Sequence, residues 1–356
     1  MPPCGEEWRG LGQLRLWPRR QGGDADHGGL AGGVAQLALN PGIAEAPLRA
    51  WLPAFIAMAL GWGSSFFFIS LALDGFGPSQ VGFGRILIGA VVLGGLALWF
   101  RKRPRLTWRD VVAIGAVGAC LSGAPMILIP MAQQEITSIL ASLLNATTPL
   151  WTALFVALLI PAERVSRLQL AGLIIGALGI AVLVGAWDVE SFSLLGTVLM
   201  LISTLLYGVG STLSRVLLSK VQESATTLSA VQMGLSALML APFALAAPRP
   251  APEVWALDSS ALWGLLLLGV LGSSFAYLLF WKVVKVAGAT TAASVTYVVP
   301  VVALFLGLVV LKEQLHWYEP VGAIIVFAGV ALTQRRRKVL VSVATPMQVV
   351  DQPDAR

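Results

Sequence analysis

The residues best placed to do chemistry in this sequence lie inside long apolar stretches, where charge and unpaired polarity are costly. Arg85 follows Pro78 by about two helical turns, which is about 10 Å if a helix begins at that proline. It either faces a water-filled cavity and attracts an anionic group, or extends its side chain to the nearer membrane surface. The other candidates carry amide, hydroxyl or aromatic groups suited to binding an amphipathic solute: Trp62, Asn145, Thr148, Tyr207, Ser211, Tyr277, Thr296 and Tyr297. Interhelical hydrogen bonds and interfacial aromatic belts are the structural alternatives for them.

Two prolines, Pro149 and Pro300, also lie inside apolar stretches. Each removes a backbone donor and frees the carbonyl four residues earlier, on Asn145 and Thr296. Helices interrupted at matching places in two halves of a chain are typical of transporter binding sites. A simple packing kink is the alternative at either proline.

Two glutamates, Glu163 and Glu313, end apolar stretches just before the next one begins. They either gate a pathway by pairing with the neighbouring Arg164 and Lys312, or cap the helix that follows. The dipole of a helix stabilises a carboxylate near its first turn, which favours the capping role.

Catalytic and metal-binding groups do not converge in this sequence. The only cysteines are Cys4 and Cys120 and the only histidines His27 and His316, too scattered for a zinc cluster. The glycines at 208 and 210 are not followed by the Lys-Ser/Thr pair of a phosphate-binding loop. We therefore expect no cofactor, no metal site and no enzymatic activity.

The elements that position these residues are predicted by composition: 57% of the residues are hydrophobic and 12% charged. A soluble domain of this size could not carry that balance, so the chain is predicted to be an all-α integral membrane protein in a lipid bilayer. Residues 1–47 read as a flexible tail and residues 335–356 as a disordered basic cytoplasmic tail. Ten membrane-spanning helices are predicted at about 51–73, 78–100, 110–131, 136–160, 168–187, 192–214, 226–247, 259–281, 287–311 and 317–334.

The net charge of +6 indicates how the chain is oriented in the membrane and does not indicate a nucleic-acid partner, because the basic residues lie at predicted helix ends. One set of alternate loops holds most of the Lys and Arg residues, including 101–109 and 335–338, and the opposite set is mainly acidic. The basic side is predicted to be cytoplasmic, with both termini there.

An internal repeat is the most informative feature of the sequence. The segment from Ile139 resembles the segment from Thr290, with Pro149 aligned to Pro300 and Glu163 to Glu313. Continuing backwards, the register places Gly118 on Gly269, Trp62 near Tyr207 and Arg85 near Gln232. Two five-helix repeats follow, 51–187 and 192–334, and the odd number of crossings in each inverts one relative to the other. A duplication that only builds a bundle is the alternative.

These segments resemble the drug/metabolite transporter superfamily, in its ten-helix form with two EamA domains. The resemblance rests on LGWGSSF around Trp62, on Pro78 followed by Arg85, and on the two proline-centred segments that end at Glu163 and Glu313. It implies a bacterial inner-membrane exporter of amino acids, other metabolites or drugs, acting by alternating access on a small-molecule substrate. A channel or scramblase without coupled transport is the alternative function, and a homodimer is possible because small-residue helix faces allow one.

Overall fold

The computed structural model describes residues 47–99, 105–159, 166–185, 187, 193–218, 221, 223–248, 252–256, 259–287, 291–292 and 294–334. All of the described residues belong to one compact unit within Ile43–Arg356. The predicted tails, residues 1–47 and 335–356, lie outside the described residues except for Pro47, and so does Glu163.

Ten apolar helical segments follow one another along the described part of the chain. Eight are long and apolar enough to cross a membrane, and α8 and α15 are shorter apolar helices. The prediction of an all-helical membrane protein with ten spans is confirmed, with boundaries a few residues from those expected. In order, the segments are α2 (Leu48–Leu73), α3 (Pro78–Trp99), α4–η1–α5 (Trp108–Gly118, Ala119–Gly123, Ala124–Gln133), α6–α7 (Ser138–Asn145, Thr148–Leu159), α8 (Arg167–Leu183), α9 (Leu194–Leu217), α10 (Ala225–Ala246), α11–η3–α12 (Ser260–Leu267, Leu268–Phe275, Ala276–Ala287), η4–α14–η5 (Ser294–Tyr297, Val299–Leu306, Gly307–Leu311) and α15 (Tyr318–Gln334).

Side-chain caps fix where several of these helices begin. Thr107 accepts a hydrogen bond from the backbone N–H of Asp110, whose carboxylate accepts one in return from the Thr107 N–H. Ser166 and Gln169 form the same reciprocal pair at the start of α8. Each pair satisfies backbone donors that the first helical turn leaves free, so the helices start at the loop edges.

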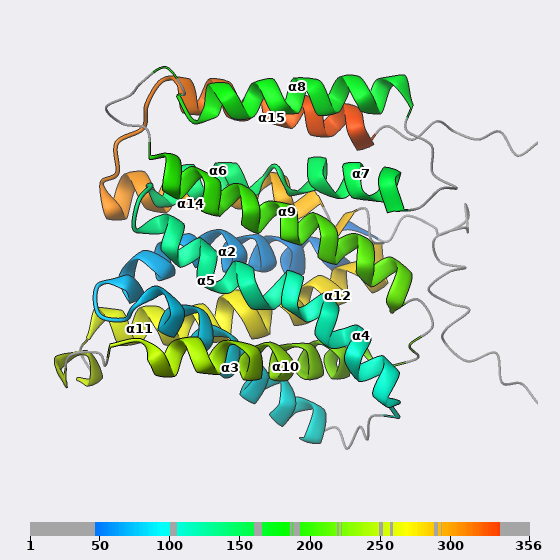
Figure 1. Cartoon of the computed structure of the whole chain (residues 1–356), viewed down its shortest axis with the longest axis vertical. Helices are drawn as coiled ribbons and strands as arrows, with labels where there is room; N and C mark the ends of the chain where they lie inside the picture. Colours follow the sequence, from blue (N-terminus) through cyan, green and yellow to red (C-terminus); the bar gives the residue numbers. More distant parts are fainter. Residues whose placement is uncertain are drawn as a thin grey trace, which may run out of the picture. The chain divides into compact units, whose positions relative to one another are not determined.

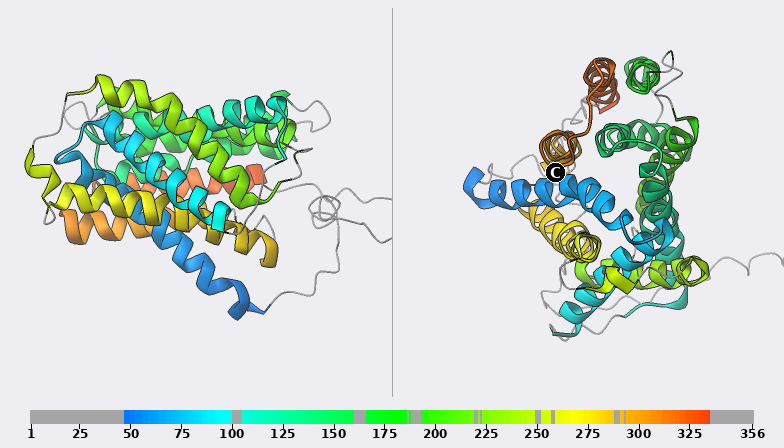
Figure 2. Two further views of the ribbon diagram at one scale, coloured as in Figure 1. Left: turned by 90° about the horizontal axis from the view of Figure 1, so that it is seen from below. Right: turned by 90° about the vertical axis from the view of Figure 1, so that its left-hand side faces the viewer.

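Corresponding helices of the two repeats run antiparallel. Gln80 at the start of α3 donates to the carbonyl of Pro248 just after the end of α10 (2.7 Å). Gln169 near the start of α8 donates to the carbonyl of Thr333 near the end of α15 (3.3 Å). Each contact joins the start of one helix to the end of its counterpart, as two inverted five-helix repeats require. Figure 1 shows α8 beside α15 and α3 near α10, and Figure 2 shows α8 and α15 together at one edge.

Glycines let α8 and α15 approach backbone to backbone. A Cβ added at Gly172 would lie 2.6 Å from the carbonyl oxygen of Gly329, and one added at Gly329 would lie 2.6 Å from the backbone nitrogen of Gly176. This is the small-residue packing by which helices associate in a membrane, where the hydrophobic effect does not drive them together.

Four spans are irregular in their middle, and the irregularities match between the repeats. The span of α6 and α7 is interrupted just before Pro149, and that of η4 and α14 just before Pro300. The third and eighth spans carry the π-helical segments η1 and η3, at equivalent places in the repeat register. The π-helical segments have no local sequence signature and were not predicted, whereas the prolines mark the other two breaks.

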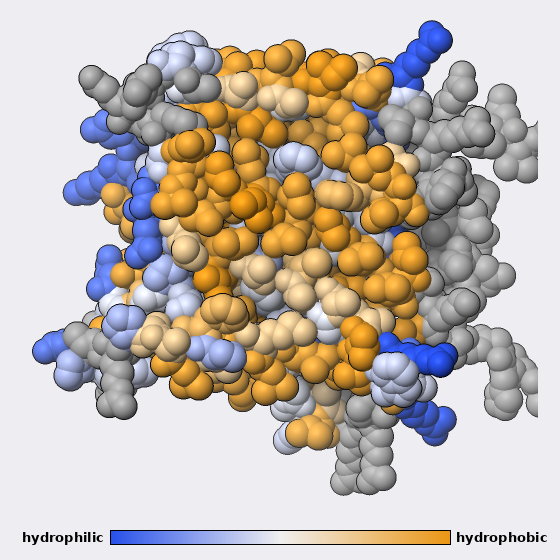
Figure 3. Space-filling model, viewed as in Figure 1, coloured by the Kyte–Doolittle hydropathy of each residue, from blue (hydrophilic) through white to orange (hydrophobic). Residues whose placement is uncertain are grey.

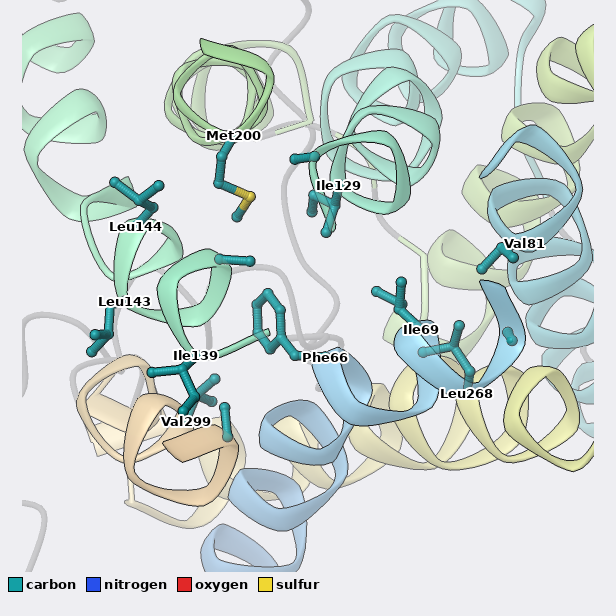
Figure 4. Packing of buried hydrophobic residues seen from close by; sticks show 14 of the residues in the cluster. Phe66, Ile69, Val81, Ile129, Ile139, Leu143, Leu144, Met200, Leu268 and Val299 are labelled. Atoms are coloured by element: carbon teal, nitrogen blue, oxygen red, sulfur yellow. The ribbon is translucent and has the colours of Figure 1, made fainter. Parts of the chain in front are cut away.

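Apolar side chains cover the viewed face between the helix ends, and polar residues gather at both ends (Figure 3). Many large apolar side chains are exposed, among them Leu98, Leu178 and Ile324. Inside, Phe66 lies among Ile129, Ile139 and Met200 from three other spans (Figure 4). The spans therefore bury apolar clusters in the interior and leave an apolar surface for lipid.

Candidate functional site

A cavity of about 260 Å³ lies between the two repeats. It is lined by all of the predicted substrate-binding residues except Tyr297, whose ring instead packs edge-on against Phe327 of α15 (5.8 Å between centroids). Because the lining residues come from eight spans, four in each repeat, one short stretch of sequence does not define the cavity. Its lining consists of Trp62, Ser65, Phe66, Ile69, Arg85, Ile86, Leu121, Ser122, Met126, Ile129, Asn145, Thr148, Tyr207, Ser211, Met233, Ser273, Tyr277, Thr296 and Val299.

Much of this lining comes in pairs related by the repeat. Asn145 precedes Pro149 by four residues and Thr296 precedes Pro300 by four, and both face the cavity. In the register that aligns Gly118 with Gly269, Ser122 corresponds to Ser273, and both line it too. A cavity lined by equivalent residues of inverted repeats lies at the pseudo-twofold axis, where such transporters hold their substrate.

Arg85 lies within the cavity and forms its hydrogen bonds across the repeat boundary. Its Nε donates to the hydroxyl of Ser273 (2.9 Å), and one terminal nitrogen makes a longer contact to the Gly272 carbonyl (3.4 Å). Both acceptors belong to η3, so the side chain reaches a neighbouring π-helical segment rather than the membrane surface. The guanidinium makes no ion pair with any residue that the structure describes.

Gln232 repeats this arrangement in the other half, without the charge. Its side-chain amide donates to the hydroxyl of Ser122 in η1 (2.9 Å), and that hydroxyl also contacts Ser236 (3.0 Å). The predicted relation of Arg85 to Gln232 is thus matched by equivalent acceptors on equivalent π-helical segments. In the described chain Gln232 does not line the cavity, so the two halves differ in what they present there.

The break before Pro149 supplies a second polar group to the cavity. The carbonyl of Asn145, which the proline leaves without its helical donor, accepts a hydrogen bond from the Thr148 hydroxyl (2.8 Å). The side-chain oxygen of Asn145 is buried and has no hydrogen-bond partner in the described chain. An unpaired buried acceptor is costly, so it suits an N–H donor on a bound molecule.

Aromatic rings form one wall of the cavity. The Trp62 indole packs edge-on against Tyr277 (5.8 Å between centroids) and at a tilt against Phe280 (5.7 Å). These contacts hold the indole by packing on two sides, so it presents a fixed apolar surface beside the charged and polar groups.

The cavity is closed towards the helix ends that include residues 73–78 and 133–138. Phe66, Ile69 and Ile129 on that side are all buried. Farther out, the Gln133 amide joins α5 to α2 by donating to the Phe66 carbonyl (2.9 Å) and the Ser70 hydroxyl (3.2 Å). Core packing and polar links between spans together close this end.

Glu313 adds a contact between the repeats at the same end. One carboxylate oxygen accepts from the Ser138 N–H (2.8 Å), and the other accepts from the Ser138 hydroxyl and the Ile139 N–H (3.0 Å each). Lys312 turns the chain towards α6 with a left-handed backbone (φ 55°), which is uncommon for a residue other than glycine. The carboxylate therefore caps a helix of the other repeat, not the helix that follows it in sequence.

Sequence reasoning missed Ser122, Ser273, Gln133 and the partner helix of Glu313. Ser122 and Ser273 resemble any small residue of a membrane helix when taken alone. The signal that would have found them is the repeat register, since both stay serine at equivalent positions four residues after aligned glycines.

The EamA-like transporter family model matches residues 49–185 and 194–335, one copy on each repeat. The chain belongs to this family. An EamA-like transporter is a multi-pass membrane protein, as the ten apolar segments of this chain require, and its matched residues include every residue that lines the cavity.

Relatives of this EamA-like chain match it over nearly their whole length. An uncharacterized transporter of Archaeoglobus fulgidus is 30% identical over 78% of this chain and 94% of its own. A probable terminal-alkyne amino-acid exporter of Streptantibioticus cattleyicolor and the uncharacterized inner membrane transporter YedA of Escherichia coli are each 29% identical over 80% of this chain, covering 93% and 92% of their own lengths. A solved crystal structure superimposes with a TM-score of 0.56 at 21% identity over 80% of this chain and 96% of its own, which supports the fold.

Proposed function

We propose that this chain is a secondary exporter of small polar or amphipathic metabolites, amino acids among them, in a bacterial inner membrane. The observation that carries the proposal is the cavity between inverted repeats, which combines a guanidinium, an unpaired amide oxygen and an aromatic wall. Inverted repeats around one midplane site allow that site to face either side of a membrane in turn.

The chemistry of the cavity favours a substrate with a carboxylate and a hydrogen-bond donor. Arg85 is suited to a carboxylate, because a guanidinium offers five N–H donors in a planar fork. The free Asn145 oxygen is suited to an ammonium or amide group, and the Trp62 wall to an apolar side chain. A volume of about 260 Å³ is below the range of typical drug-binding pockets, which favours metabolites of amino-acid size over larger drugs. The Streptantibioticus relative is named a probable terminal-alkyne amino-acid exporter, which supports an amino-acid substrate.

The charge bias of the loops supports an orientation with both termini in the cytoplasm. In that orientation, the end closed by Phe66, Ile69 and Glu313 faces outwards. Export then requires the Glu313 contacts with α6 to break, while the opposite end of the cavity closes. The carboxylate acts as an outer latch between the repeats.

Transport by the full-length chain in proteoliposomes tests the proposal. Vesicles are loaded with a mixture of the common L-amino acids, and efflux of each is followed by mass spectrometry with and without amino acids outside. We expect efflux that saturates with internal concentration and accelerates when the same amino acid is present outside. Trp62→Ala should reduce it, and Leu178→Ala, on the apolar surface, should not. Efflux that rises linearly with concentration and ignores external solute would instead identify a channel or scramblase.

A further inference from the structure

The cavity carries an unbalanced positive charge. Among the described residues that line it, Arg85 alone has a formal charge, and the described acidic residues lie at or near helix ends, away from the lining. Its hydrogen-bond acceptors are a serine hydroxyl and a backbone carbonyl, both neutral, and the tyrosines beside it, Tyr207 and Tyr277, are neutral at physiological pH.

Most of the donor capacity of Arg85 is also unused. The guanidinium has five N–H groups, and the two contacts to η3 occupy Nε and one terminal nitrogen. The remaining donors have no protein acceptor in the described chain. Buried charges in proteins are normally paired with an opposite charge. In the described chain, no carboxylate supplies that charge to Arg85.

We infer that the Arg85 subsite is an anion site occupied throughout the transport cycle, by the substrate carboxylate or, when substrate is absent, by a small inorganic anion such as chloride. A guanidinium in the membrane interior is strongly destabilised without a counter-charge because it loses hydration there, and a counter-charge is attracted several times more strongly than in water. This inference rests on the proposed function for the carboxylate, while the inorganic anion follows from Arg85 alone.

An anion bound at Arg85 affects the return step of the transport cycle. A carrier that has released its carboxylate must return to the first side with Arg85 still in the cavity. The return step is faster with an anion bound than with the bare guanidinium, since the anion keeps the site neutral while both ends of the cavity are closed. Export of a carboxylate then becomes exchange for an inorganic anion, and the chain alone exchanges that anion across a membrane.

Radiolabelled chloride in proteoliposomes tests this directly. Vesicles containing the full-length chain are loaded with labelled chloride and diluted into buffer whose anion is either chloride or dextran sulfate, a polymer too large for the cavity, at a clamped membrane potential. We expect external chloride to speed release of the label at least about fivefold over dextran sulfate, as exchange on a common site requires. Arg85→Gln should abolish the acceleration and Arg85→Lys should keep part of it. Arg109→Gln removes an exposed arginine far from the cavity and should leave it unchanged.

Equal release into chloride and dextran sulfate by the folded wild-type chain would overturn the inference, as would an acceleration that survives in Arg85→Gln. Amino-acid efflux from the same vesicles separates this result from the proposed function. Amino-acid exchange that depends on Arg85 without any chloride exchange refutes the anion site alone. Chloride exchange that depends on Arg85 without amino-acid exchange supports the anion site and refutes the amino-acid substrate. Arg85→Lys, which keeps the charge, together with size-exclusion profiles, identifies any variant that has lost its fold.

Discussion

Arg85 and Gln232 occupy related positions in the two repeats and make related hydrogen bonds with opposite consequences. Each reaches across the repeat boundary to a serine hydroxyl at 2.9 Å, and each of those serines lies in a π-helical segment. Arg85 places a charge in the cavity, whereas Gln232 makes an uncharged link behind it. Both repeats therefore keep a hydrogen bond to a serine of the other repeat as part of the scaffold. The difference between arginine and glutamine at these positions creates the chemical difference on which substrate recognition depends.

The largest expected effect comes from removing that charge. Arg85→Gln makes the two positions equivalent, and the half-saturating concentration of a transported amino acid should rise about 30-fold or more, because loss of a buried charged partner costs about 2–5 kcal/mol. Vesicle transport measures the change. Gln232→Leu, which removes the uncharged link, should cost far less, and an equal loss in both variants would mean that the link, not the charge, matters.

Scaffold contacts should affect stability and leave recognition unchanged. Gly329→Val forces α15 away from Gly176 and Gly172 of α8, so the free energy of unfolding should fall by about 1–3 kcal/mol. Denaturation in detergent measures this loss, and the remaining folded carrier should keep its half-saturating concentration. Gly94→Val is the matched control, since no atom outside the local backbone of α3 and the two adjacent residues lies within 4 Å of a Cβ built there. An altered substrate preference in Gly329→Val would show that the packing of α15 against α8 also affects the binding site.

Exchanging the two residues tests whether the axis makes the positions equivalent. In the double variant Arg85→Gln and Gln232→Arg, the guanidinium should donate to Ser122, which lines the cavity. We expect it to recover about tenfold of the affinity lost in Arg85→Gln, or about 1.4 kcal/mol. Transport by single and double variants in parallel gives the answer. Equal activity of the double and single variants would show that position 232 cannot deliver a charge to the cavity.

The smallest expected difference lies between the two serines. Ser273→Ala removes an acceptor from a charged group, so the half-saturating concentration should rise about three- to tenfold as Arg85 loses its orientation. Ser122→Ala removes an acceptor from a neutral amide and should change it less than about twofold. The same vesicle assay distinguishes them, and identical effects would indicate that both serines act through packing.

Most of the fold was predictable from the sequence, because span length, composition and the repeat register are global patterns that report the bilayer and the inversion. The sequence also selected eight of the residues that line the cavity, but it missed others such as Ser122 and Ser273, and Tyr297, which it selected, does not line the cavity. Tyr297 precedes Pro300 by three residues, but in the 3₁₀ turn of η4 its ring packs against Phe327, whereas its neighbour Thr296 lines the cavity. The π-helical segments and the Glu313 cap were not predictable, since each depends on atoms far away in sequence.

Discrimination between an L-amino acid and its carboxamide tests most directly whether Arg85 recognises the carboxylate of the substrate. The two compounds differ in the group that Arg85 would hold. Wild-type chain in proteoliposomes should transport the carboxylate form with at least about 30-fold higher efficiency than the amide, and Arg85→Gln should reduce that preference below about threefold. A preference for the carboxylate form that persists unchanged in folded Arg85→Gln would show that Arg85 does not recognise the carboxylate.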